Sequence, residues 1–164
     1  MGNVTMPGGF CGKAKGYVAN DEYYTDNKEW DKIKEYIPKD KIIWEAFYGD
    51  GNSSRYLSTL GFNVVSYDED FFSANHGDIV VTNPPFSKKK EVIQRLVELD
   101  KPFIMIMPLE VLTYKYTESI RNHLQVLIPK QRMIFLKDGK QVKFNYDCIF
   151  YCYKLLVSCW TLFF

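Results

Sequence analysis

The sequence KIIWEAFYGDGNSS, which runs from Lys41 to Ser54, joins an apolar strand to a helix through a glycine turn. The part up to Phe47 is predominantly apolar, which is typical of a buried strand. Gly49 and Gly51 follow, and glycine lets the backbone turn tightly and approach a ligand closely. A helical stretch begins near Asn52. A strand, a glycine turn and a helix in this order predict a nucleotide-binding α/β unit.

Apolar segments that alternate with helices continue along the chain. Strands are expected at residues 63–67, 78–82, 102–107, 124–128, 133–136 and 147–155, and helices at 27–37 and about 88–99. Continuous apolar strands between helices are typical of sheets that are covered on both faces. We therefore predict an α/β fold, with a Rossmann-like sheet that is mostly parallel and has an antiparallel C-terminal part.

The length and composition favour one compact domain. The chain has 164 residues, of which 46% are hydrophobic and 25% charged, so one core is expected and a separate recognition domain would not fit beside it. Residues 1–20 hold five of the ten glycines and predict a flexible leader, which leaves 21–164 as the domain. The net charge of +1 means that any basic surface must be local.

The cysteines and the two ends of the chain indicate the cellular environment. No CxxC pair occurs and the two histidines are far from the cysteines in sequence, so no metal site is expected. Free thiols favour a cytoplasmic or other reducing intracellular compartment. The N-terminus lacks the apolar segment of a secretory signal. Residues 155–164 are apolar but fall short of the ~20 residues that span a bilayer, so a core strand is expected there.

Acidic side chains lie at the glycine turn and after the next predicted strand. Asp68 follows Gly49 at nearly the ~20-residue spacing of an acid that binds ribose hydroxyls. Glu45, Asp50 and Asp70 add negative charge, which would repel a pyrophosphate, and no phosphate loop is present. A ligand with a sulfonium, an amino group and a ribose suits these acids, so S-adenosyl-L-methionine is the expected cofactor. The alternatives are an ordinary turn between strand and helix, and a solvated loop acid at Asp70.

The segment Asn83-Pro84-Pro85-Phe86 directly follows an apolar strand. Two prolines fix φ twice and remove two amide donors, so the chain must leave the sheet as a stiff loop. The Asn83 side-chain oxygen and the Pro84 carbonyl can accept the two hydrogens of an adenine amino group, which makes its nitrogen nucleophilic. Phe86 offers a flat face to a base turned out of its stack. The alternative is a Pro-Pro turn with a core phenylalanine.

Together these motifs resemble the N6-adenine DNA methyltransferases of the class I S-adenosylmethionine-dependent superfamily. The resemblance covers about Tyr24 to Phe86 and implies a site-specific, adenine-specific DNA methyltransferase with the class I fold. It assigns cofactor binding to Glu45, Phe47, Gly49, Gly51 and Asp68, and contact with the methionine part to Tyr24 and Thr25. It assigns catalysis to Asn83, Pro84, Pro85 and Phe86.

The sequence departs from this family in two places. Only about ten residues separate Asp68 from Asp78, so the family's third strand and its helix are expected to be reduced or missing. No target-recognition domain is recognisable, which leaves room for a partner protein that recognises the target. Lys88, Lys89, Lys90 and Arg132 are candidates for binding nucleic acid through its phosphates, and a solvated helix start is the alternative for the lysines.

Other functions share parts of these motifs. A similar Asn-Pro-Pro loop serves RNA adenine methylation and protein glutamine methylation, although Phe86 in place of tyrosine favours a nucleic acid. A catalytically silent methyltransferase-like subunit is the alternative from another class. The recognition sequence and the oligomeric state are not predicted.

Overall fold

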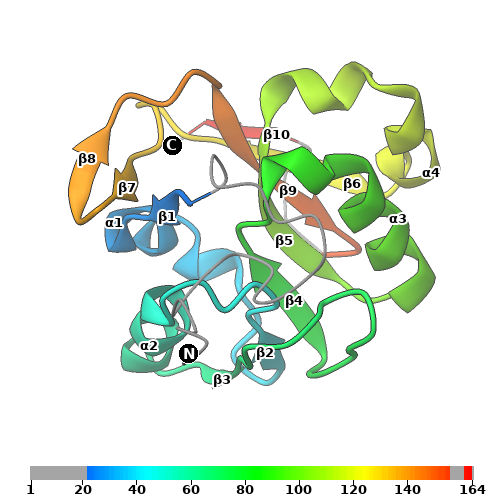
Figure 1. Ribbon diagram of the computed structural model, residues 1–164. Coiled ribbons are helices and arrows are strands. Elements are labelled where there is room, and N and C mark those ends of the chain that lie inside the picture. Colours follow the sequence, from blue (N-terminus) through cyan, green and yellow to red (C-terminus); the bar gives the residue numbers. More distant parts are fainter. Residues whose placement is uncertain (1–21, 156–160, 164) are drawn as a thin grey trace, which may run out of the picture.

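The computed structural model describes residues 22–155 and 161–163, and the predicted leader 1–20 lies outside them. The main sheet has seven strands in the order β10-β6-β9-β5-β4-β2-β3 (Figure 1). Strands β3, β2, β4 and β5 are mutually parallel, whereas β9 is antiparallel to both β5 and β6. The predicted parallel sheet with an antiparallel C-terminal part is thus confirmed. Its strands are β2 (Ile42–Trp44), β3 (Asn63–Val65), β4 (Ile79–Thr82), β5 (Phe103–Pro108), β6 (Leu124–Ile128), β9 (Cys148–Tyr153) and β10 (Thr161–Phe163).

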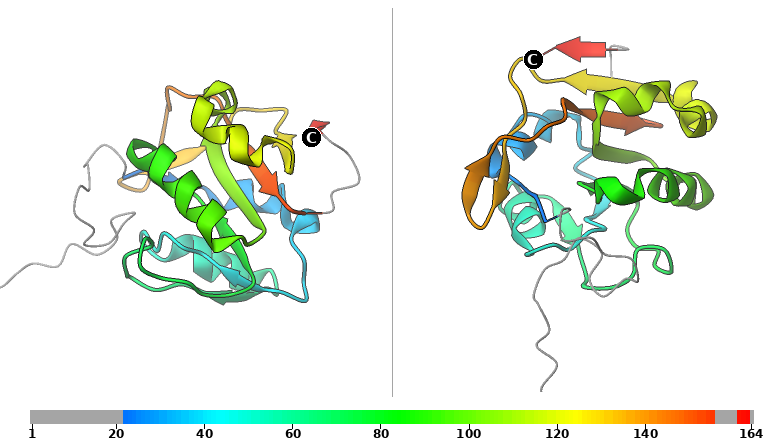
Figure 2. Two further views of the ribbon diagram at one scale, coloured as in Figure 1. Left: turned by 90° about the vertical axis from the view of Figure 1, so that its right-hand side faces the viewer. Right: turned by 45° about the horizontal axis from the view of Figure 1, so that its top comes forward.

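Helices cover both faces of this sheet (Figures 1 and 2). Along β5, Ile104 and Ile106 pack with α1 and α2, whereas Phe103 and Met105 pack with α3 and α4. This alternation explains why the strand is apolar throughout, since neither face of it meets water. The helices and 3-10 turns are α1 (Asn27–Asp31), η2 (Lys34–Tyr36), α2 (Asn52–Thr59), η3 (Phe86–Lys88), α3 (Lys89–Leu99), η4 (Leu109–Thr113), η5 (Lys115–Thr117) and α4 (Glu118–Arg121).

A second, three-stranded sheet was not predicted. It has the order β1-β7-β8 and contains β1 (Tyr24–Thr25), β7 (Phe135–Lys137) and β8 (Lys140–Val142). Asp138 and Gly139 join β7 to β8 with φ of 52° and 71°, the left-handed turn that two-residue hairpins favour. A two-residue strand such as β1 carries no periodicity, so only its tertiary pairing with β7 reveals it.

Two predicted elements differ from the structure near the chain ends. The helix expected at 27–37 ends at Asp31 and is followed by a 3-10 turn at Lys34–Tyr36, and Pro38 favours the extended conformation of Ile37 that ends this turn. Its predicted apolar face is nevertheless buried. The C-terminal strand is Thr161–Phe163 and lies at the sheet edge beside β6, while residues 156–160 and 164 lie outside the described part.

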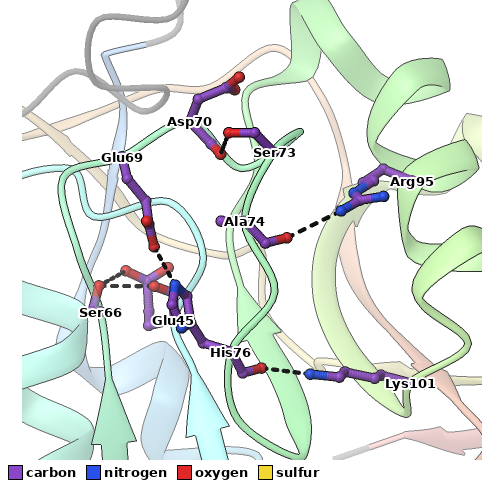
Figure 3. A network of polar contacts seen from close by, with 9 residues as sticks. All are labelled: Glu45, Ser66, Glu69, Asp70, Ser73, Ala74, His76, Arg95 and Lys101. Atoms are coloured by element: carbon purple, nitrogen blue, oxygen red, sulfur yellow. Dashed lines mark hydrogen bonds and ion pairs between the residues drawn. The ribbon is translucent and has the colours of Figure 1, made fainter.

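The connection between β3 and β4 contains no helix and no strand. Strand β3 is therefore the edge of the main sheet, which confirms the predicted loss of a third strand and its helix. Side chains from α3 and from the loop before β5 fix this connection: Arg95 Nη2 donates to the Ala74 carbonyl (3.2 Å) and Lys101 Nζ to the His76 carbonyl (2.8 Å) (Figure 3). Glu69 Oε1 also pairs with His76 Nε2 at 2.6 Å.

Cys148 and Cys152 on β9 are buried free thiols, and burial raises the pKa of each to about 12. Within residues 22–155 and 161–163, no group of three or more His, Cys, Asp or Glu side chains has an arrangement that could hold a metal ion. In the same ranges, no helix is long and apolar enough to cross a membrane.

Candidate active site

The glycine turn after β2 has a backbone that only glycine adopts easily. Gly49 and Gly51 have φ of 58° and 72°, in the left-handed region. A Cβ on Gly51 would lie 2.7 Å from Arg55 Nη1 and 3.0 Å from the Tyr48 ring. A Cβ on Gly49 would lie 3.3 Å from the Tyr24 ring. The structure therefore brings Tyr24 of β1 against the turn that the sequence predicts to hold the cofactor.

Glu45 holds the carboxyl ends of three strands together. Its Oε1 accepts hydrogen bonds from Thr82 Oγ1 (2.7 Å) at the end of β4 and from the Phe47 amide (3.2 Å). Ser66, just after β3, donates to the Glu45 backbone carbonyl (2.8 Å) (Figure 3). Burial raises the pKa of the Glu45 carboxyl to about 7, although these hydrogen bonds oppose the shift. The Glu45 carboxylate thus accepts hydrogen bonds from protein groups, and one of these bonds fixes the Phe47 amide.

The other predicted acids differ in what their carboxylates do. Asp50 Oδ1 accepts from the Asn52 amide (2.9 Å) at the start of α2, and Asp70 Oδ1 accepts from the Phe72 amide (3.1 Å). Both carboxylates therefore cap the turns in which they lie. Asp68 is exposed, and its carboxylate has no hydrogen bond to any residue that the structure describes. Asp68 therefore differs from Asp50 and Asp70, because no described residue binds its carboxylate.

Asn83 lies at the carboxyl end of β4 with 6% of its surface exposed, and Pro84 and Pro85 after it are also buried. Its Nδ2 donates to Thr25 Oγ1 at 3.0 Å. Its Oδ1 is buried and has no hydrogen-bond partner within the described part of the chain. A buried acceptor left unsatisfied costs about 1–3 kcal/mol, so this oxygen indicates a site for a ligand that donates a hydrogen.

Phe86 belongs to a cluster of aromatic rings beside Asn83. Its ring centroid lies 5.4 Å from that of Phe144 and 6.3 Å from that of Tyr146. Tyr146 is 40% exposed and lines a cavity of about 420 Å³ at the carboxyl end of β5. Phe144 and Tyr146 were not predicted as site residues, although two aromatic residues around Asn145 in a polar stretch are a usable signal.

The four predicted nucleic-acid-binding residues fall into two groups. Lys90 is exposed and Lys88 is partly exposed. Lys89 Nζ lies 3.6 Å from a glutamate carboxylate of η4, and Arg132 Nε pairs with Asp147 Oδ1 at 2.8 Å. Lys89 and Arg132 therefore also form ion pairs with protein groups, and the Arg132 partner Asp147 directly follows Tyr146 of the aromatic cluster.

Comparison with known proteins finds relatives for part of the chain, including the segment that contains Asp68 and the Asn83–Phe86 loop. The sequence model of the family described as adenine-specific methyltransferase EcoRI matches residues 68–128. The type II methyltransferase M.EcoRI of Escherichia coli is 35% identical over 96 residues, which cover 58% of this chain and 25% of that protein. The type II methyltransferase M.MgeORF184P of Mycoplasma genitalium is 27% identical over 116 residues, which cover 58% of this chain and 37% of that protein. The chain therefore spans about a quarter to a third of the length of these relatives, and the predicted family resemblance is confirmed.

Two solved structures share the fold. A dimethyladenosine transferase from Plasmodium falciparum has a TM-score of 0.52 at 16% identity, and covers 79% of this chain and 62% of its own. A putative class I S-adenosylmethionine-dependent methyltransferase from Listeria monocytogenes has a TM-score of 0.51 at 11% identity, with 93% and 68% covered. The predicted class I methyltransferase fold is confirmed.

Proposed function

We propose that this chain, a relative of the adenine-specific DNA methyltransferases, transfers a methyl group from S-adenosyl-L-methionine to the N6 amino group of adenine in DNA. The observation that carries the proposal is the Asn83 Oδ1 atom, which is buried and lacks a donor. An amino group that donates one hydrogen to it satisfies this oxygen. The same hydrogen bond activates the amino nitrogen.

The residues at the ends of β1, β2 and β3 fit the cofactor. Gly49 and Gly51 present backbone without side chains, and Tyr24 lies over the turn. The exposed Asp68 accepts hydrogen bonds from the ribose hydroxyls. When bound, the cofactor supplies an electrophilic methyl group on its sulfonium. Glu45 and Asp70 support this pocket through the protein groups that they bind, so we assign them a positioning role.

The acceptor amino group is held from the other side of the site. Asn83 Oδ1 and the Pro84 carbonyl each accept one of its hydrogens, which draws the nitrogen towards a tetrahedral geometry and frees its lone pair. These acceptors are fixed before the substrate arrives, because Asn83 is buried and two prolines follow it. Phe86 supplies the face on which the adenine ring stacks.

The DNA backbone meets the site at the start of α3. Lys88 and Lys90 follow the catalytic loop, Asn83–Phe86, and neutralise phosphates there. Such contacts carry no sequence information. A partner protein that recognises the target sequence therefore belongs to the proposal. A reducing intracellular compartment also belongs to it, and the buried free thiols of Cys148 and Cys152 support that setting.

Transfer of labelled methyl groups to matched DNA, RNA and glutamine-containing peptide substrates tests the proposal. We expect label in adenine-containing DNA, identified by mass as N6-methyladenine. Asn83→Ala should lower turnover by about 10²-fold or more and leave cofactor affinity unchanged. Asn122→Ala, at an exposed asparagine, is the control and should keep full activity.

Three outcomes would overturn the proposal. They are label only in RNA or peptide, full activity in Asn83→Ala, and absence of cofactor binding at millimolar concentration. Cofactor binding without transfer to any substrate would instead support a silent methyltransferase-like subunit.

A further inference from the structure

The hydrogen bond between Asn83 and Thr25 joins the main sheet to the second sheet. Asn83 follows β4 of the main sheet, and Thr25 lies in β1 of the small sheet, 58 residues earlier. Both side chains are buried, with 6% and 2% of their surfaces exposed, and the donor and acceptor are 3.0 Å apart. This contact occupies one end of the Asn83 amide and leaves the other end, Oδ1, without a hydrogen-bond partner among the described residues.

The position of the Thr25 hydroxyl is fixed by its surroundings. Strand β1 pairs with β7 through Thr25 and Phe135, and the amide of Asp26 donates to the Ile134 carbonyl (3.2 Å). The chain then enters α1, whose residue Glu29 accepts from the Ile134 amide (3.1 Å). Threonine is branched at Cβ, which restricts its χ1. The hydroxyl oxygen is therefore a preorganised acceptor for Asn83 Nδ2.

The orientation of the Asn83 amide decides what the acceptor amino group meets. The last torsion of asparagine is broad and roughly two-fold, so the amide can present either its oxygen or its NH₂ group. An NH₂ group facing the substrate would place donors against donors. In the structure the Thr25 hydroxyl accepts from Nδ2, and this bond stabilises the orientation that leaves the oxygen free for the acceptor amino group.

We infer that Thr25 is a positioning residue that holds the Asn83 amide with its oxygen towards the acceptor amino group. The inference rests on the proposed function for its catalytic consequence, and on the hydrogen bond itself for its structural one. It gives the Thr25 side chain a role other than the contact with the methionine part that the resemblance implies. It also gives the small sheet a function, since the pairing of β7 with β1 fixes Thr25 beside Asn83.

Thr25→Val and Thr25→Ser test this role in single-turnover and steady-state transfer to DNA. Valine has the shape of threonine but no acceptor, so we expect kcat to fall by about tenfold or more while the cofactor Kd changes by less than about twofold. Serine keeps the hydroxyl and should restore most of kcat. Thr117→Val is the matched control, because Thr117 is also buried and hydrogen-bonded but lies in η5. It should lower stability and leave kcat unchanged.

A readout without turnover separates this inference from the proposed function. In NMR spectra, the Asn83 side-chain NH₂ protons should exchange slowly in the unmodified protein and in Thr25→Ser, and faster in Thr25→Val. Unchanged exchange in Thr25→Val would overturn the inference whether or not the protein is active. Full kcat in Thr25→Val, or a loss confined to the cofactor Kd, would overturn it as well. Absence of methyl transfer by the unmodified protein would contradict the proposed function alone, and slow exchange would still support the Thr25 anchor.

Discussion

The buried carboxyl of Glu45 predicts a pH-dependent stability that Glu45→Gln should remove. Burial raises its pKa from the ordinary value of 4.5 to about 7 in the folded protein. The folded state therefore binds a proton that the unfolded chain has released. The resulting stabilisation is complete below about pH 4.5 and is lost as the pH rises through about 7.

The magnitude follows from the two pKa values. Their difference corresponds to about 3 kcal/mol of unfolding free energy between acidic and alkaline conditions. Glutamine keeps an oxygen that can accept from Thr82 Oγ1 and from the Phe47 amide, but it cannot ionise. The free energy of unfolding of the unmodified protein should therefore fall, relative to Glu45→Gln, by about 2.5 kcal/mol as the pH rises from about 5 to about 8.

Urea unfolding at a series of pH values measures this difference, and Trp30 and Trp44 are buried reporters for fluorescence. Glu35→Gln, at an exposed glutamate of η2, is the control and should track the unmodified protein at every pH. A difference between Glu45→Gln and the unmodified protein that stays constant from about pH 5 to about 8 would refute the reasoning.

Three further predictions concern binding and turnover. Asp68→Ala should weaken cofactor binding by more than about tenfold in calorimetry, because the ribose hydroxyls lose their acceptor, and an unchanged Kd would argue against that contact. Phe86→Ala should remove a stacking face worth about 1–3 kcal/mol, weakening acceptor binding and slowing turnover, while Phe86→Trp keeps partial activity; equal activity of the two variants in a transfer assay would contradict stacking. The methylation rate at subsaturating DNA should fall steeply with salt, and Lys90→Gln should make that dependence shallower; a rate that is independent of salt would point to a small or uncharged substrate.

Most of the main sheet and the Asn83–Phe86 loop were predictable from local sequence. The apolar runs before Gly49 and before Asn83 predicted β2 and β4, because strands covered on both faces must be apolar throughout. The glycine turn and the Pro-Pro pair were recognisable because their backbone requirements are local and few residues meet them. The loss of the third strand was likewise visible as a short spacing between Asp68 and β4.

Contacts between distant segments were decided only by the tertiary structure. The sequence predicts Glu45 and Asp70 as cofactor ligands, and only the fold shows that their carboxylates also accept hydrogen bonds from protein amides and a hydroxyl. It also could not show that Thr25 meets Asn83, because a two-residue strand has no period and its partner β7 lies more than a hundred residues away. Hydrogen bonding by a side chain depends on which strand ends meet at the sheet edge. The pattern within a single strand does not contain that information.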